Sequence, residues 1–162
     1  MMHFICKFFE TRCALVSIVL ICFFSLGMAW IMEHVFGIQA CQLCYYERYV
    51  YGAVGIVALS GLFLKKPQFL IITGLIFFFG MGLSFYHVGI QNGWFELPSF
   101  CQTAQFDSNA SLEDLRAQLL GTPTITCNLV SWSLFGISLA GYNFIVSLGL
   151  SLFSFLGFWK SR

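Results

Sequence analysis

Four long stretches without Asp, Glu, Lys or Arg constrain this 162-residue chain more than any other feature. They cover residues 13–32, 49–64, 69–95 and 132–159. An α-helix needs about twenty apolar residues to cross the hydrocarbon core of a bilayer, and three of the stretches meet that length. Residues 49–64 are fewer, but Arg48 and Lys65 can extend from both ends to the membrane surface. The sequence therefore predicts four transmembrane helices.

The composition agrees with a membrane protein. Hydrophobic residues make up 59% of the chain and charged residues 9%, whereas a soluble domain carries about a quarter charged residues. The net charge of +1 gives no reason to expect nucleic acid as a partner. We predict an all-α membrane protein, a four-helix bundle that forms one integral membrane domain over residues 1–162. Its helices are expected at about 13–32, 46–64, 69–90 and 132–159, with loops at about 33–45 and 91–131.

The basic residues predict the orientation in the membrane, because Lys and Arg concentrate in cytoplasmic segments. Six of the eight fall on one side of the predicted bundle: Lys7, Arg12, Lys65, Lys66, Lys160 and Arg162. Both termini are then cytoplasmic, and the two loops face outward. The alternative is that residues 13–32 are a cleaved signal peptide. Their length and the lack of a nearby A-x-A site favour a retained helix.

The first outward loop carries Cys41 and Cys44 in the run Cys-Gln-Leu-Cys-Tyr-Tyr-Glu-Arg, where the second helix begins. The amide groups and the dipole at a helix N-terminus favour a thiolate. Arg48 follows Cys44 by one turn, with Glu47 beside it, and its charge can stabilise a Cys44 thiolate and a neighbouring anion. A C-x-x-C disulfide constrains little chain, so a purely structural role explains this pair poorly. Arg48 taken alone is also explained as an interfacial anchor.

The second outward loop offers another pair, Cys101 and Cys127. Outside the cytoplasm, thiols meet an oxidising environment, so pairing is expected. A structural disulfide remains open as the role of this pair. Between its members, Ser111 and Asp114 predict the start of a short helix that runs through Leu120.

The other uses of cysteine in this chain are weaker. Four outward thiols can hold zinc or copper, but the wide spacing of the second pair and the risk of oxidation disfavour a metal, so none is expected. The remaining cysteines fit small apolar packing positions; they are Cys6, Cys13 and Cys22.

Three segments together resemble one known family. The string from Cys41 to Arg48 closely resembles the first-loop motif of the disulfide bond formation protein B (DsbB) family. The run Tyr-His-Val-Gly-Ile-Gln at 86–91, with Trp94 and Pro98 before Cys101, is similar to the approach to that family's third cysteine. Residues 127–143 resemble the entry to its fourth helix. The resemblance covers nearly the whole chain.

The resemblance implies a quinone-dependent protein disulfide oxidoreductase of the bacterial inner membrane, with its cysteines facing the periplasm. It implies that Cys101 is attacked by a reduced periplasmic DsbA-like protein. Electrons then pass to the first pair, through a transient Cys41–Cys127 bond, and Cys44 delivers them to ubiquinone or menaquinone.

The resemblance also implies a cofactor site. Cys44, Arg48 and Glu47 are expected to surround the quinone, and Arg48 to stabilise charge on a ring oxygen. His87 is expected to donate a hydrogen bond or proton to the ring, or alternatively to be an interfacial histidine with satisfied hydrogen bonds. Two other functions remain open: a quinone reductase similar to vitamin K epoxide reductase, and a non-catalytic membrane scaffold with structural disulfides.

Overall fold

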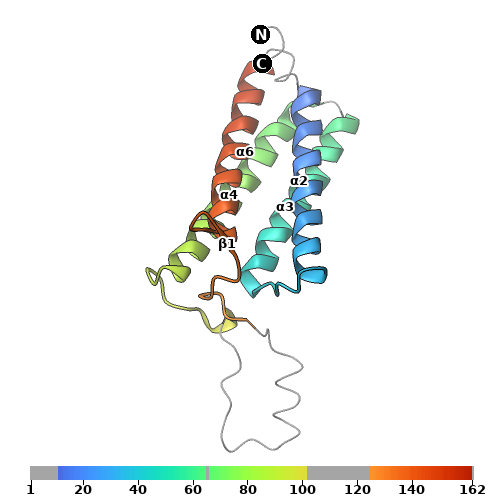
Figure 1. Cartoon of the computed structure of the whole chain (residues 1–162). Helices are drawn as coiled ribbons and strands as arrows, with labels where there is room; N and C mark the ends of the chain where they lie inside the picture. Colours follow the sequence, from blue (N-terminus) through green and yellow to red (C-terminus); the bar gives the residue numbers. More distant parts are fainter. Residues whose placement is uncertain (1–10, 65, 102–124, 162) are drawn as a thin grey trace, which may run out of the picture.

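The computed structural model describes residues 11–64, 66–101 and 125–161. Within these residues, four long helices run side by side in one elongated bundle (Figure 1). They are α2 (Thr11–His34), α3 (Gln42–Leu64), α4 (Gln68–Gln91) and α6 (Leu139–Ser161). Each is long and apolar enough to cross a membrane. The four predicted apolar helices are confirmed, and their orientation in a membrane stays a prediction.

Successive helices alternate in direction, so the connections fall at two opposite ends of the bundle (Figure 1). The tight turn from α3 to α4 lies at the same end as the start of α2 and the end of α6. The α2–α3 connection lies at the other end, with the described parts of the segment between α4 and α6. Both cysteine pairs are therefore at one end. The short helix predicted from Ser111 and Asp114 lies outside the described residues, as does Cys6.

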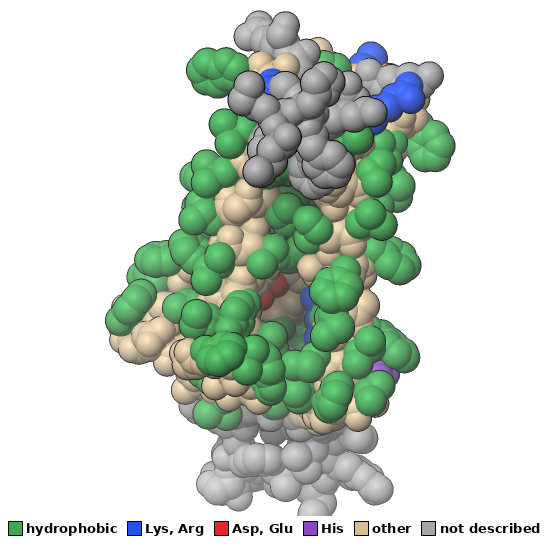
Figure 2. Space-filling model, turned by 45° about the horizontal axis from the view of Figure 1, so that its top comes forward, with side chains coloured by type: hydrophobic (Ala, Val, Ile, Leu, Met, Phe, Trp, Pro, Cys, Tyr) green, Lys and Arg blue, Asp and Glu red, His purple; other side chains and the backbone are tan. Residues whose placement is uncertain are grey.

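Apolar side chains of mixed size, from alanine to phenylalanine, hold the helices together. The main cluster of buried residues contains Ala14, Leu15, Ile18, Cys22, Tyr51, Val54, Ala58, Leu70, Phe77 and Leu150. Cys22 is 2% exposed, so it takes a packing position, whereas Cys13 is exposed. Large apolar side chains such as Phe23 and Phe63 are exposed. Figure 2 shows apolar side chains over most of one face of the bundle. Such a surface suits lipid rather than water.

Helix α3 begins at Gln42, four residues before the predicted position 46. The Tyr45 amide donates to the carbonyl oxygen of Cys41 at 3.2 Å, so Cys41 occupies the N-cap position. The Cys44 amide donates to Cys41 Sγ at 3.3 Å, as an N3 amide donates to a capping side chain. The cysteine motif thus starts the helix itself, and Cys44 lies in its first turn.

Helix α6 begins at Leu139 rather than at the predicted position 132. The preceding residues form a small antiparallel hairpin, in which β1 (Ser133–Leu134) pairs with β2 (Ile137–Ser138). Phe135 and Gly136 join the strands with φ of 51° and 79°, the positive values that a tight hairpin turn needs. Ser138 Oγ then accepts the Gly141 amide at 3.2 Å and caps the helix. Hydrophobicity alone did not reveal this turn.

The close packing of α3 gives a prediction for Gly61. A Cβ at this position would lie 2.7 Å from Phe69 Cβ and 3.1 Å from Leu15 Cδ1. Because a Cβ cannot move without its backbone, Gly61→Ala should lower the free energy of unfolding by about 1–3 kcal/mol. Gly52→Ala, on the same helix with nothing within 4 Å, is the matched control and should be neutral or slightly stabilising. Thermal unfolding of both variants in detergent measures the difference, and equal unfolding temperatures would contradict the packing.

Candidate functional site

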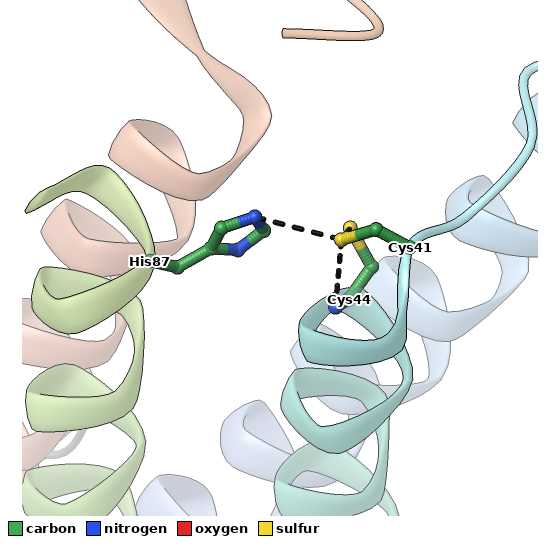
Figure 3. A group of neighbouring side chains, drawn as sticks. All are labelled: Cys41, Cys44 and His87. Carbon is green, nitrogen blue, oxygen red and sulfur yellow. Dashed lines mark hydrogen bonds between the residues drawn. The ribbon is translucent and has the colours of Figure 1, made fainter. Parts of the chain in front are cut away.

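The first cysteine pair lies at the N-terminus of α3 (Figure 3). Cys41 Sγ and Cys44 Sγ are 2.8 Å apart and are present as thiols. Cys41 is 3% exposed, while Cys44 is only partly buried. The two sulfurs therefore differ in accessibility. Cys41 is enclosed by protein, and Cys44 is the more open member of the pair.

His87 of α4 points at this pair across the bundle (Figure 3). Its Nε2 lies 3.5 Å from Cys41 Sγ, and its Nδ1 lies 3.0 Å from Glu47 Oε1. His87 is 1% and Glu47 8% exposed. A carboxylate accepts hydrogen bonds, so Nδ1 carries a proton and Nε2 faces the sulfur. Glu47, predicted near the cofactor, thus orients His87. This contact links two residues that are forty positions apart in the chain.

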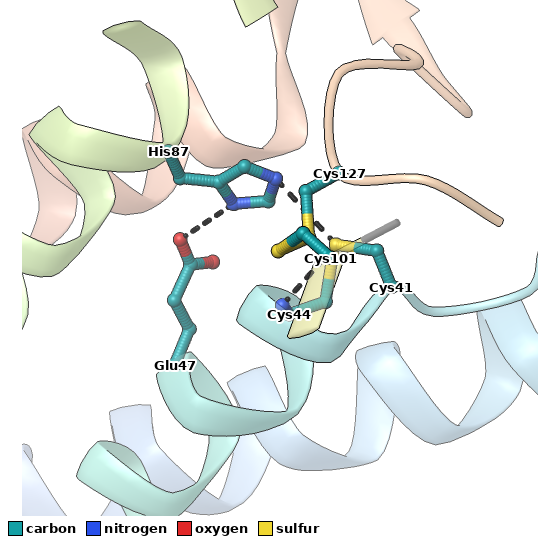
Figure 4. The surroundings of a disulfide bond; sticks show 6 residues. All are labelled: Cys41, Cys44, Glu47, His87, Cys101 and Cys127. Carbon is teal, nitrogen blue, oxygen red and sulfur yellow. Dashed lines mark hydrogen bonds and ion pairs between the residues drawn. A yellow bond between two sulfur atoms is a disulfide. The ribbon is translucent and has the colours of Figure 1, made fainter. Parts of the chain in front are cut away.

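The second pair is a disulfide between Cys101 and Cys127, as the sequence predicted (Figure 4). Cys101 ends a 3₁₀ turn, η1 (Ser99–Cys101), and its carbonyl oxygen accepts the Cys127 amide at 3.4 Å. The two cysteines are 1% and 0% exposed. They share a buried apolar cluster with Cys41, against which Cys44 packs. The structure thus brings all four predicted cysteines together and shields the second pair from solvent.

Arg48 forms its ion pair with Glu33, near the end of α2. It also donates to the carbonyl oxygen of Ala29 at 3.4 Å and lies over the Tyr45 ring, 5.1 Å from its centroid. Tyr45 Oη donates to the other oxygen of Glu33 at 2.6 Å. No motif in the sequence indicated a role for Glu33. The one available signal was an acidic residue directly after the first apolar stretch.

A cavity of about 390 Å³ connects these groups. Cys41, Cys44, Glu47, Arg48 and His87 all line it. Side chains from the other helices complete the wall, among them Phe24, Met28, Met32, Tyr142 and Val146. Figure 2 shows a hollow on one face of the bundle, with acidic and basic side chains inside an otherwise apolar surround. Every residue predicted for the cofactor site therefore borders one space.

A polar network crosses the bundle beside the cavity. Tyr51 Oη donates to Asn143 Oδ1 at 2.6 Å, and Asn143 Nδ2 donates to Ser84 Oγ at 2.8 Å. These bonds link α3, α6 and α4, and both Tyr51 and Asn143 line the cavity. Because buried polar groups need partners in an apolar environment, the network fixes the spacing of these helices. Its members carried no recognisable motif.

Cys41 precedes α3, and its contacts lower the pKa of its thiol. The hydrogen bond with the Cys44 thiol, then the contact with His87, lower the pKa of Cys41 from 9.0 to about 4, although burial raises it. The thiolate should persist at about pH 6, where an ordinary thiol is protonated. Its contribution to the stability of the reduced protein is complete above pH 9 and is lost as the pH falls through about 4.

The ultraviolet absorbance of the thiolate, followed during a pH titration of the reduced protein, measures this pKa. Cys41→Ser should remove the low transition, and His87→Ala should move it toward the ordinary thiol range. Cys13→Ser, which alters an exposed cysteine on α2, should leave it in place. A single transition near the ordinary value in the unmodified protein would contradict the prediction.

Comparison with known proteins finds a family match and several similar sequences. The family described as "Disulfide bond formation protein DsbB" matches residues 11–157. Disulfide bond formation protein B 1 of Pseudomonas aeruginosa is 30% identical over 151 residues, covering 85% of this chain and 90% of that protein. An uncharacterized protein of Rickettsia prowazekii is 24% identical over 132 residues, covering 80% of this chain and 77% of that protein. The family match spans α2, α3, α4, most of α6 and both cysteine pairs.

Proposed function

The chain belongs to the DsbB family of disulfide bond formation proteins, multi-pass membrane proteins that are generally disulfide-forming oxidoreductases, and we propose that it reoxidises a periplasmic DsbA-like protein with a membrane quinone. The net reaction takes two electrons and two protons from a protein dithiol. It yields a protein disulfide and a quinol.

One observation carries this proposal. Two cysteine pairs, one a disulfide and the other two thiols, share a buried cluster, and the thiol pair borders a cavity with Arg48 and His87. A scaffold held by structural disulfides needs neither a thiol pair beside a cavity nor a buried histidine directed at a sulfur. This distribution of thiols corresponds to the state after electrons have reached the inner pair.

The first exchange takes place at the second pair. A thiolate of the reduced partner attacks Cys101, forms a mixed disulfide and releases Cys127 as a thiolate. The partner's second thiol then attacks the partner sulfur that is bonded to Cys101, which closes the partner's disulfide and releases Cys101. Both cysteines are reduced, and the partner leaves oxidised. Because Cys101 is 1% exposed, the segment carrying it has to move outward before the partner reaches it.

The second exchange passes the electrons inward. The Cys127 thiolate attacks Cys41 of an oxidised first pair, which forms a Cys41–Cys127 bond and releases Cys44 as a thiolate. Cys101 then attacks Cys127, which restores the Cys101–Cys127 disulfide and releases Cys41. The contacts of Cys41 with the Cys44 thiol and His87 favour this release, because a stabilised thiolate is a good leaving group.

The cavity fits a quinone head group. Its volume of about 390 Å³ lies within the range of small-molecule sites, and apolar walls with a few polar groups suit a ring with two oxygens. When bound, ubiquinone or menaquinone supplies the two-electron oxidation of the first pair. Cys44, Arg48, Glu47 and His87 are the residues we assign to holding it.

These residues have separate tasks. Cys44, the more open sulfur, acts as the nucleophile; its proton goes to the quinol, and the Cys41 sulfur lies 2.8 Å away, ready to re-form the disulfide. Arg48 supplies positive charge to the cavity, and Glu33 holds the guanidinium in position. His87 holds a proton at Nδ1 against Glu47 and presents Nε2 to Cys41. Re-formation of the Cys41–Cys44 disulfide completes the electron transfer.

We also propose that the protein lies in the bacterial inner membrane with its cysteine end in the periplasm. The start of α4 and the end of α6 lie at the opposite end of the bundle (Figure 1). Lys66 precedes α4 and Lys160 is in the last turn of α6, as expected for a cytoplasmic face. Labelling spheroplasts with a membrane-impermeant thiol reagent after mild reduction should modify Cys44. Labelling only after disruption of the membrane would overturn the orientation.

Purified full-length protein tests the function directly. Mixed with a reduced DsbA-like protein and ubiquinone or menaquinone, it should consume partner thiols and quinone in a ratio of two thiols to one quinone. Without quinone, oxidation should stop after about two partner molecules per chain, because the fully oxidised enzyme holds two disulfides. A folded preparation that oxidises no partner thiol with either quinone would exclude the oxidase and favour a scaffold.

A further inference from the structure

The first cysteine pair and His87 have the composition of a metal site. Cys41 Sγ, Cys44 Sγ and a His87 ring nitrogen all lie within 4.8 Å of one another. Two thiolates and one imidazole are ligands that Zn²⁺ prefers, and a C-x-x-C pair at a helix N-terminus is a common way to present two of them. The spacing of the cysteines was visible in the sequence, but the third ligand, from another helix, was not.

The tautomer of His87 suits metal binding. Glu47 accepts the proton of Nδ1 at 3.0 Å, so the lone pair of the neutral ring is on Nε2, the nitrogen 3.5 Å from Cys41 Sγ. A histidine that binds a metal usually donates its other ring N–H to a carboxylate in this way. His87 is 1% and Glu47 8% exposed, so water does not compete well for either partner. The geometry provides a ligand and its supporting carboxylate together.

A zinc ion needs only a small adjustment of this cluster. Around tetrahedral Zn²⁺, with bonds of about 2.0–2.3 Å, neighbouring ligand atoms lie roughly 3.5–3.8 Å apart. The Sγ–Nε2 distance of 3.5 Å already fits, and the sulfurs must separate from 2.8 Å. Cys44 lies in the first helical turn and borders the cavity, so its side chain has room to rotate. The cavity leaves space for a water molecule as the fourth ligand.

We propose that the reduced first pair and His87 bind one Zn²⁺, with Glu47 orienting the histidine, and that the bound ion holds this pair in its reduced state. Binding displaces any proton still held by the two sulfurs and transfers no electrons. While both sulfurs coordinate the ion, they cannot form a disulfide. The binding site itself does not depend on the proposed quinone chemistry, whereas the arrest of turnover rests on the proposed function.

Cobalt titration of the reduced full-length protein, under anaerobic conditions and free of quinone, tests the site. Co²⁺ is the probe because thiolate ligation gives an intense charge-transfer absorption and tetrahedral geometry gives strong visible bands. We expect one Co²⁺ per chain, displacement by Zn²⁺ with loss of the bands, and no such bands in the oxidised protein. A Cys101→Ser/Cys127→Ser background should give the same spectrum, because the second pair is not a ligand.

Matched variants separate ligands from bystanders. Cys44→Ser and His87→Ala should each weaken Co²⁺ binding at least about tenfold, and Glu47→Gln should weaken it about 10–100-fold while keeping the thiolate absorption. Cys13→Ser and His34→Ala are the controls; they alter another cysteine and an exposed histidine on α2, and binding should not change. Zn²⁺ should also raise the unfolding temperature of the reduced unmodified protein but not of His87→Ala.

Two results would overturn the site: an absence of thiolate–cobalt absorption in folded reduced protein, or unchanged affinity in folded His87→Ala. Neither depends on turnover, so a failed quinone assay leaves the titration informative. Conversely, if the protein oxidises its partner but binds no Co²⁺ when reduced, the proposed function stands and the proposed metal site is wrong.

Micromolar Zn²⁺ added during turnover should stop quinone reduction in the unmodified protein.

Discussion

Cys44→Ser should abolish quinone reduction, with a loss of at least about a thousandfold in rate, because it removes the proposed nucleophile that faces the cavity. Serine is too weakly acidic to replace the thiol and cannot form the Cys41–Cys44 disulfide. The loss should be the same whether electrons come from a DsbA-like protein or from a small dithiol. Quinone absorbance measured with both donors tests this.

Cys101→Ser is the informative companion variant. It should lose oxidation of the DsbA-like protein by a similar factor, because no sulfur remains at the attacked position. It should retain quinone reduction by a small dithiol, which reaches the first pair through Cys44. Cys13→Ser, at an exposed position on α2, should be active with both donors. Normal mixed-disulfide trapping with the DsbA-like protein in Cys101→Ser would contradict this division between the pairs.

Arg48→Gln should lower the rate of quinone reduction about 10²–10³-fold, since it removes the positive charge that we assign to the cavity. Arg48→Lys keeps a charge but loses the planar guanidinium, so an intermediate rate is expected. Stopped-flow measurement of quinone loss, with kcat separated from KM, gives the effect. Arg12→Gln is the matched control because Arg12 is exposed at the opposite end of α2.

Glu33→Gln distinguishes a cofactor role for Arg48 from a purely structural one. If the guanidinium acts on the quinone, removing its partner carboxylate leaves the cation in the cavity, and most of the activity should remain. If Arg48 only fastens α3 to α2 through the ion pair, Glu33→Gln and Arg48→Gln should lose activity and stability equally. Equal losses would therefore remove Arg48 from the catalytic site.

The sequence predicted those features of the fold that depend on residues close together in the chain. Each helix is specified by its own run of apolar residues, which must satisfy its backbone hydrogen bonds internally when it crosses a membrane. The cysteine motif placed Cys41 and Cys44 at a helix start by their position beside such a run. Local signals also misled: the apolar residues before Leu139 continue a hydrophobic stretch, yet Phe135 and Gly136 adopt a hairpin turn there.

Only part of the candidate site could be predicted from the sequence, because several of its contacts join different helices and loops. Arg48 follows from the motif, but its pairing with Glu33 depends on the packing of α2 against α3. Cys101 is buried against the first pair, because apolar contacts at the end of the bundle draw the two loops together, and no motif indicated this burial.

By itself, the sequence determined the four apolar helices, the segments that carry the cysteines and the family resemblance. Only the tertiary structure decided that His87 faces Cys41 with its other nitrogen on Glu47, and that the same cluster has the geometry of a metal site. The physical reason is the separation of the interacting residues in the chain. A run of apolar residues determines its own helix, whereas contacts between residues forty or more positions apart depend on how the helices pack, and no local pattern encodes that packing.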